Sequence, residues 1–261
     1  RYCMRIGTLR ASLAHRHPSG AITINTRDYI MHKVLILGAG KIGALISGLL
    51  GDSGDFDVQI ADANQDAAQA VAAKHDLDNV RPFAIDATDK AALTTHVTEH
   101  RPAAVISSLP FYCNPLVAEV AREQGLHYFD LTEDVAVTEA VRKQSEGATT
   151  AFVPQCGLAP GFISIAANEL ISHIDSIRSV KLRVGALPQN PNNVLKYSLT
   201  WSTEGVINEY ANLCESIVSG ELTKVLALEG LELIQIDGTE YEAFNTSGGL
   251  GSLAETYAGK V

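Results

Sequence analysis

Short apolar runs alternate with segments of helical length between Met31 and about residue 160. Such alternation is typical of parallel strands joined by helical crossovers that cover both faces of a sheet. We expect strands over 32–37, 56–61, 80–85, 103–107, 127–131 and 150–153, and helices over 42–50, 64–75, 89–99, 115–124 and 134–145. The pattern therefore predicts an α/β fold, a doubly wound parallel sheet over residues 31–160.

The pattern changes beyond Pro160, where longer alternating segments replace the buried runs. We expect strands over 180–187 and 196–201, a helix over 203–217 and a hairpin over 231–244, with Asp237-Gly238 as its turn. Residues 161–261 are thus predicted to form a second, mixed α+β domain. We expect the chain to stop before this domain is complete.

The first 30 residues show no sustained period and carry five arginines with Asp28 as their one acidic residue. An arginine-containing, acid-poor leader can be a transit peptide. We favour the simpler interpretation, an unstructured or non-native extension with Met31 as the original start.

Composition narrows the class of protein further. With 46% hydrophobic residues the chain is not disordered, and a net charge of −10 argues against nucleic acid as a partner. Apolar runs stay far shorter than the ~18 residues of a membrane span. Four scattered cysteines and no clustered histidines predict reduced thiols, a cytoplasmic protein and no metal site.

Gly38-Ala39-Gly40-Lys41-Ile42-Gly43 is a GxGxxG motif between the first strand and the first helix. In this setting the glycines allow a tight turn, the approach of a pyrophosphate and close helix packing, while the helix N-terminus favours the phosphate charge. The motif predicts a Rossmann-type sheet that binds a dinucleotide, with Gly38, Gly40, Lys41, Ile42 and Gly43 at the cofactor.

Asp62 ends the second strand, where a carboxylate can accept hydrogen bonds from both ribose hydroxyls and repel a 2′-phosphate. This residue predicts NAD rather than NADP; otherwise it is a helix N-cap. Asp86 follows the third strand and is either an adenine contact or an N-cap. Ser107, Ser108, Leu109 and Pro110 follow the fourth strand and are expected beside the nicotinamide ribose, or else form a polar turn.

Residues that handle protons should lie on loops after the later strands. Asp130 and Glu133 are candidates for a general base, with helix capping over 132–134 as the alternative. Cys156 is a possible proton donor, although a buried small hydrophobe is the favoured interpretation. The polar and aromatic residues expected to line a substrate pocket are Tyr112, Asn193, Tyr197, Trp201 and Asn208.

Five segments together carry a more specific resemblance: VLILGAGKIG, ISSLPFYCNPLVAEVAREQGLHYFDLTED, PQCGLAPGFISI, LKYSLTWSTEGVINEY and FNTSGGLGSLAET. Over residues 31–261 the chain resembles the saccharopine dehydrogenase family, in particular its bacterial lysine 6-dehydrogenase-like branch. Saccharopine-forming members often have GLDPG where this chain has Ala159 in place of the acid.

The resemblance implies a Rossmann domain interrupted by a mixed α/β substrate and dimerisation domain, and a homodimer. It places Gly38, Gly40, Gly43, Asp62, Ser107, Leu109 and Pro110 at the cofactor. It also implies NAD(P)-dependent oxidation at an amino-acid C–N bond.

We therefore expect an NAD-dependent amino-acid dehydrogenase that acts on a CH–NH donor such as lysine or saccharopine. A polyamine-type reductive condensation, as in carboxynorspermidine or homospermidine formation, is the enzymatic alternative. A catalytically inactive dinucleotide-binding module is the alternative from another class. Lys181, Arg183 and Lys196 are the few basic residues available for a substrate carboxylate.

Overall fold

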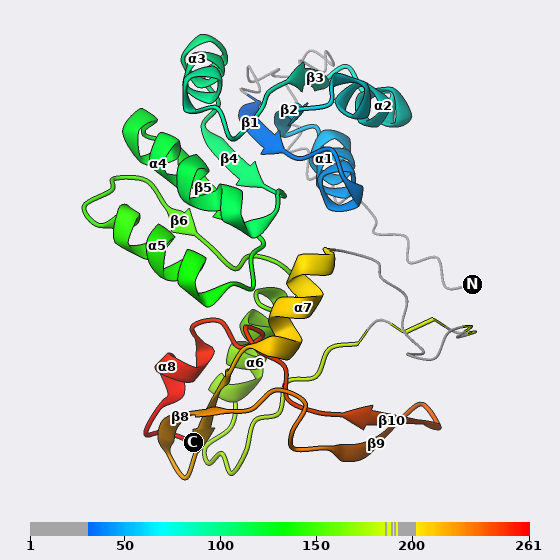
Figure 1. The fold of residues 1–261 in the computed structure, drawn as a ribbon, viewed down its shortest axis with the longest axis vertical. Coiled ribbons are helices and arrows are strands. Elements are labelled where there is room, and N and C mark those ends of the chain that lie inside the picture. Colours follow the sequence, from blue (N-terminus) through cyan, green and yellow to red (C-terminus); the bar gives the residue numbers. More distant parts are fainter. Residues whose placement is uncertain (1–30, 186, 189, 191, 193–201) are drawn as a thin grey trace, which may run out of the picture.

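A computed structural model describes residues 31–185, 187, 188, 190, 192 and 202–261. Figure 1 shows two parts: a sheet with flanking helices, and below it a part with antiparallel hairpins and further helices. The first part contains the predicted dinucleotide motif and the second contains the predicted hairpin.

The described residues of the first part form a six-stranded sheet with the order β3-β2-β1-β4-β5-β6, in which every pair is parallel. Its strands are β1 (His32–Leu37), β2 (Phe56–Asp62), β3 (Val80–Ala84), β4 (Ala104–Ser107), β5 (His127–Asp130) and β6 (Phe152–Val153). The order reverses between β1 and β4, the point at which doubly wound sheets bind their ligands. The prediction of a doubly wound parallel sheet is confirmed.

Helices cover both faces of this sheet (Figure 1). They are α1 (Lys41–Ser53), α2 (Gln65–His75), α3 (Lys90–His100), α4 (Asn114–Gln124) and α5 (Val135–Ser145), with a short 3-10 helix η1 (Phe111–Cys113) before α4. Side chains alternate between the faces of a strand, so Val34 and Ile36 pack towards α1 and α2, whereas Leu35 and Leu37 pack towards α3, α4 and α5. Because both of their faces are buried, β1 and β2 have the near-continuous apolar runs seen in the sequence.

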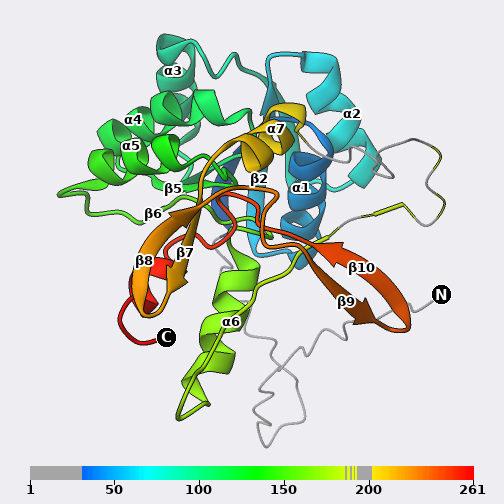
Figure 2. The ribbon, with the colours of Figure 1, turned by 60° about the horizontal axis from the view of Figure 1, so that its bottom comes forward.

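The second part begins with α6 (Phe162–Ser172) and continues with α7 (Thr203–Ala211). Two antiparallel hairpins follow, and Figure 2 shows them on either side of α6. They consist of β7 (Cys214–Val218) with β8 (Glu221–Val225), and β9 (Glu232–Ile236) with β10 (Thr239–Ala243); α8 (Leu253–Tyr257) comes last. The mixed α+β character predicted for this part is confirmed.

The β9–β10 hairpin turns where the sequence predicts it. Asp237 and Gly238 both have positive φ, 51° and 79°, as a two-residue turn with the twist of its strands requires. Tyr241 pairs with Ile234 in the antiparallel register.

Two other predictions in this part are wrong. The helix expected over 203–217 ends at Ala211, and Cys214–Val218 is a strand, because Ser219 and Gly220 adopt positive φ and turn the chain back into β8. The strand expected over 180–187 is not formed by residues 180–185, which have no regular structure. The strand expected over 196–201 lies outside the described residues.

Helices α6 and α8 are additional elements that the pattern did not reveal. Among the described residues, no helix is long and apolar enough to cross a membrane.

Candidate cofactor and substrate site

The glycine-rich turn joins β1 to α1 at the carboxyl edge of the sheet. Gly38 has φ +99°, a conformation that favours glycine, and Gly40 is the N-cap of α1 without a side-chain cap. The first N–H groups of α1 are therefore open to an anion. Lys41 and Ile42 stand exposed in the first turn of the helix.

Each glycine of the motif meets a different spatial constraint. A Cβ on Gly38 would lie 2.9 Å from Ser108, and one on Gly43 would lie 1.8 Å from the carbonyl oxygen of Gly38. A Cβ on Gly40 would meet nothing within 4 Å, so this side of the turn is open. The three positions fit a tight turn, close helix packing and room for a pyrophosphate, as the motif predicts.

Asp62 ends β2 beside the turn. Its Oδ2 accepts a hydrogen bond from the backbone N–H of Ala39 at 2.8 Å, and its Oδ1 accepts one from Asn64 at 2.9 Å. Each carboxylate oxygen keeps further lone pairs for ribose hydroxyls. The N-cap of α2 is Asn64, so the capping alternative for Asp62 does not hold.

A cavity of about 150 Å³ opens between the ends of β1, β2 and β3 and the loop after β4. It is lined by Leu37, Gly38, Ala61, Asp62, Ala63, Ile85, Asp86, Ala87, Thr88, Leu109 and Cys113. Its apolar walls and two carboxylates suit an adenosine. Residues predicted from three separate loops, Asp62, Asp86 and Leu109, thus lie around one cavity.

Asp86 lies at the mouth of this cavity. Its Oδ1 accepts hydrogen bonds from the N–H of Thr88 at 2.9 Å and from the Thr88 hydroxyl at 2.6 Å, and these bonds lower the pKa of the Asp86 carboxyl. The N-cap of α3 is Asp89, so Asp86 is not the capping residue.

The loop after β4 faces the glycine-rich turn. Ser107 is buried and donates to Oδ1 of Asn114 at 2.7 Å, whereas Ser108 donates to backbone carbonyls at the end of β1. Leu109 packs partly against the core, and Pro110 is exposed. Tyr112, predicted to bind substrate, projects into solvent from the adjoining η1 with 64% of its surface exposed.

Asp130 is fully buried at the end of β5. Its carboxylate accepts the hydroxyl of Tyr128 at 2.7 Å and the N–H groups of Thr132 and Gln155 at 3.0 Å each. Burial raises the pKa of Asp130, while these three donors oppose that rise. In this arrangement the carboxylate fixes the loops after β5 and β6 relative to one another.

Glu133 is half-buried and lies close to Glu209 of α7. Burial raises the pKa of Glu133, with a further contribution from the charge of Asp134. Burial together with the charge of Glu133 raises the pKa of Glu209 to about 7. Both carboxyls are therefore more readily protonated near neutral pH than an exposed glutamate.

Cys156 is exposed, which corrects the favoured interpretation of a buried small hydrophobe. Its backbone N–H donates to the carbonyl oxygen of Asp130 at 2.7 Å, so the loop after β6 holds it beside the end of β5. Partial burial of the sulfur and the charge of Asp130 raise the pKa of the thiol, which keeps its proton at neutral pH.

Asn208 of α7 connects the two parts of the chain. Its Nδ2 donates to Oδ2 of Asp134 at 3.0 Å, and its backbone carbonyl accepts the hydroxyl of Ser247 at 3.0 Å. Asp134 also caps α5 through Val137, at 2.7 Å. The remaining predicted substrate residues, Asn193, Tyr197 and Trp201, lie outside the described residues.

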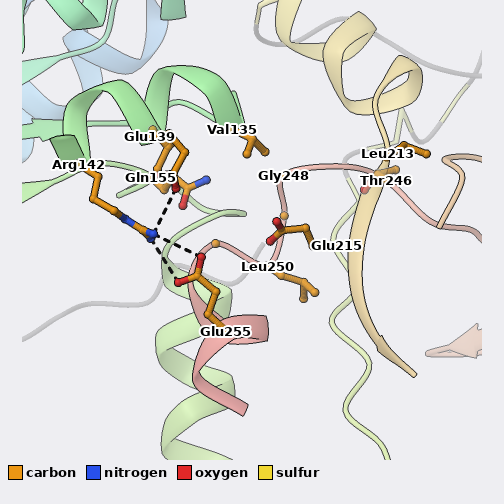
Figure 3. A pocket seen from close by; sticks show the side chains of 13 residues that line it. Val135, Glu139, Arg142, Gln155, Leu213, Glu215, Thr246, Gly248, Leu250 and Glu255 are labelled. Carbon is orange, nitrogen blue, oxygen red and sulfur yellow. Dashed lines mark hydrogen bonds and ion pairs between the residues drawn. The ribbon is translucent and has the colours of Figure 1, made fainter. Parts of the chain in front are cut away.

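A second, smaller cavity of about 40 Å³ lies between α5 and the segment before α8 (Figure 3). Arg142 enters it from α5 and pairs with Glu139 at 3.2 Å and with Glu255 at 3.4 Å. The cavity is small, and two glutamates neutralise the charge of Arg142. It is therefore a gap where the two parts of the chain meet rather than a substrate pocket.

The expected partners for a substrate carboxylate are already paired. Lys181 donates to Glu232 at 2.8 Å, and Arg183 donates to the same carboxylate at 2.5 Å. Lys196 lies outside the described residues. Within the described residues, no three His, Cys, Asp or Glu side chains gather so as to hold a metal ion.

Glu209 could not be recognised as a site residue from the sequence pattern. The helix that carries it was predicted, but its proximity to Glu133 arises only when α7 folds over the carboxyl edge of the sheet (Figure 1). The polarity of the TWSTEGVINEY segment was the available signal, and it did not indicate which side chain faces the sheet.

The strand order, the open glycine-rich turn and the cavity beyond Asp62 define a Rossmann-type NAD(P)-binding protein with an added α+β part. Residues 34–153 match the saccharopine dehydrogenase NADP binding domain, and residues 157–258 match the saccharopine dehydrogenase C-terminal domain. The chain belongs to the saccharopine dehydrogenase family.

Curated relatives support this assignment at low identity. The chain is 26% identical over 202 residues to saccharopine dehydrogenase [NADP(+), L-glutamate-forming] of Pyricularia oryzae, a match that covers 75% of this chain and 44% of that protein. It is 22% identical over 199 residues to mitochondrial alpha-aminoadipic semialdehyde synthase of Mus musculus, covering 74% of this chain and 21% of that protein. The matches thus span less than half the length of these relatives.

Among solved structures, the apo histidine-tagged saccharopine dehydrogenase (L-Glu forming) of Saccharomyces cerevisiae has the same fold. It aligns with a TM-score of 0.67 at 20% identity, covering 87% of this chain and 53% of that chain.

Proposed function

We propose that this protein is an NAD(P)-dependent oxidoreductase that acts on the C–N bond of an amino acid, with a saccharopine- or lysine-type substrate. The observation that carries the proposal is the turn at Gly38–Gly43, open at Gly40 and continuous with the cavity beyond Asp62. Membership of the saccharopine dehydrogenase family supports the amino-acid substrate. Because the matches cover only part of each relative, the activity of the whole protein is part of this proposal.

For the cofactor we propose NAD rather than NADP. The carboxylate of Asp62 would repel a 2′-phosphate, and residues 63–68 that follow it contain no lysine or arginine to neutralise one. The Pyricularia relative is named for NADP, so the comparison points the other way and Asp62 is the argument specific to this chain.

In the proposed reaction a bound nicotinamide supplies the hydride acceptor. The substrate nitrogen gives up a proton as its carbon is oxidised, and water hydrolyses the resulting imine. Glu133 is the proposed proton acceptor, because its carboxyl is half-buried at the carboxyl edge of the sheet and its pKa is raised. Glu209 interacts electrostatically with the Glu133 carboxyl. Cys156 keeps a protonated thiol nearby, and Asp130 positions the loop that carries Cys156.

The experiment that tests this function follows NADH absorbance with NAD and a panel of lysine, saccharopine and diamines. Turnover with lysine supports oxidation of a terminal amine, and turnover with saccharopine alone supports C–N cleavage. NADH consumption with a diamine and a carbonyl compound would replace the proposal by reductive condensation. Nucleotide binding without turnover on any of these would replace it by a binding module.

We also propose a homodimer through the second part of the chain. The β9–β10 hairpin and α6 expose apolar side chains, among them Leu233 at 64% and Ile165 at 68%, which a second copy would cover. Light scattering after size exclusion is expected to report a dimer that Leu233→Asp weakens. The matched control is Leu49→Asp on α1, where the leucine is 63% exposed. A monomer at all concentrations would contradict this proposal.

A further inference from the structure

Ser108 ends the backbone pairing between β1 and β4. Its N–H donates to the carbonyl oxygen of Leu37 at 2.8 Å, one residue beyond the last paired residues of the two strands. Its hydroxyl oxygen lies 2.9 Å from the same carbonyl oxygen and 3.0 Å from that of Gly38. A hydroxyl has one proton to donate, so Ser108 shares it between these two backbone acceptors.

The same hydroxyl occupies space that the two glycines leave free. A Cβ on Gly38 would lie 2.9 Å from the Ser108 hydroxyl, and a Cβ on Gly43 would lie 2.8 Å from it. The end of β1, the first turns of α1 and the loop after β4 therefore meet at one side chain. Only a small residue with a donor fits there and also holds the carbonyl of Gly38, whose φ of +99° sets the course of the turn.

We propose that Ser108 is a positioning residue that couples the two halves of the cofactor site through the backbone, rather than a residue that touches the cofactor. This inference rests on the proposed function, which places the pyrophosphate at Gly38–Gly43 and the nicotinamide ribose near 108–110. If Ser108 holds these segments in register, its hydroxyl matters for a ligand that spans both halves. A ligand confined to the cavity beyond Asp62 does not need that register.

The test compares the affinities of NADH and adenosine, which lacks a phosphate, for the full chain and for Ser108→Ala. Loss of one hydroxyl–carbonyl bond weakens NADH binding by about tenfold, whereas adenosine binding changes by less than about threefold. The matched control is Ser53→Ala, which removes a hydroxyl–carbonyl bond of 2.7 Å at the far end of α1 and leaves both affinities unchanged. Circular dichroism and thermal melting establish that each variant is folded.

A second variant, Ser108→Cys, has the same branching with a somewhat larger sulfur and only a weak donor, so its NADH affinity is expected between those of the wild type and Ser108→Ala. It carries the test should Ser108→Ala not fold. Equal losses for adenosine and NADH, or no loss for NADH, overturn the inference while leaving the proposed function intact. Wild-type protein that binds neither ligand overturns the proposed function itself.

Discussion

The side-chain amide of Asn208 in α7 donates a 3.0 Å hydrogen bond to Oδ2 of Asp134, whose other oxygen caps α5. The Asp134 carboxylate thus caps α5, which flanks the sheet, and also binds α7 from the second part of the chain. The same contact brings Glu209 beside Glu133, because the two residues neighbour Asn208 and Asp134 in the sequence. The proximity of Glu133 and Glu209 therefore depends on the contact between the two parts of the chain.

Replacement of Asn208 by aspartate should open this junction in a pH-dependent manner. Asn208→Asp removes the donor and adds a carboxylate next to Glu133, Asp134 and Glu209, a loss of about 1–3 kcal/mol when all are ionised. The melting temperature is expected to fall more at pH 8 than at pH 5.5. Asn168→Asp is the control, because exposed Asn168 only accepts from Tyr257 and an aspartate still can. A loss of equal size at both pH values would refute the electrostatic explanation.

Alanine at two glycines of the turn should have different effects: at Gly40 it should weaken cofactor binding, and at Gly43 it should destabilise the fold. Gly40→Ala meets no atom of the protein, so its melting temperature is retained, but the methyl group enters the space proposed for the pyrophosphate and weakens NADH binding by about tenfold or more. Gly43→Ala drives a methyl against the carbonyl of Gly38 and destabilises the fold by about 3 kcal/mol or more. Equal melting temperatures for the two variants would contradict this geometry.

His96 should make the protein less stable in acid. It is buried against Gln59, with its Nε2 2.9 Å from the amide oxygen, and burial followed by the charge of His100 lowers its pKa from 6.5 to about 4. The unfolded chain then binds the proton more readily than the folded one. This contribution is complete above pH 6.5 and is lost as the pH falls towards 4, by at most roughly 3 kcal/mol. Urea unfolding of His96→Gln should lack that part of the pH slope; an unchanged slope would assign it to other groups.

Glu209 should govern how the stability of the junction changes as the pH rises from about 4.5 to about 7. Its pKa is raised from 4.5 to about 7, so the folded state holds a proton that the unfolded chain releases, and stability declines as the pH rises through this range. Glu209→Gln is expected to be about 1 kcal/mol more stable than the wild type at pH 8 and no more stable at pH 4.5. In the proposed reaction it also removes an ionisation near pH 7 from the profile of kcat/KM. A profile that keeps this ionisation would assign it to another group.

The sheet could be predicted because its central strands are buried on both faces. Residues such as Val34, Leu35, Ile36 and Leu37 are all buried, which produces the uninterrupted apolar runs typical of a covered parallel sheet. The second part is different, since its strands are largely exposed and show weak alternation. Cys214–Val218 could therefore be taken for the end of a helix, and only the turn at Ser219 and Gly220 decides that it is a strand.

The candidate site also contains some residues that the sequence could predict and others that it could not. Gly38, Gly40, Gly43, Asp62 and Asp86 follow strands whose order is implied by the alternating pattern, so their convergence could be foreseen. The pairing of Glu133 with Glu209, by contrast, depends on a tertiary contact that no local pattern records. The ion pairs of Lys181 and Arg183 with Glu232 could not be predicted for the same reason.

The cofactor site at Asp62 and Gly40 is tested most directly by titrating the protein with NADH and with NADPH and following the fluorescence of the nucleotide. Asp62 and the open turn at Gly40 predict saturable binding of NADH, tighter than NADPH by about tenfold or more. In Asp62→Ala this preference should shrink, because the carboxylate that repels the 2′-phosphate is gone. Saturable NADPH binding tighter than NADH would contradict the assignment of NAD, and the absence of binding by either nucleotide would contradict the cofactor site itself.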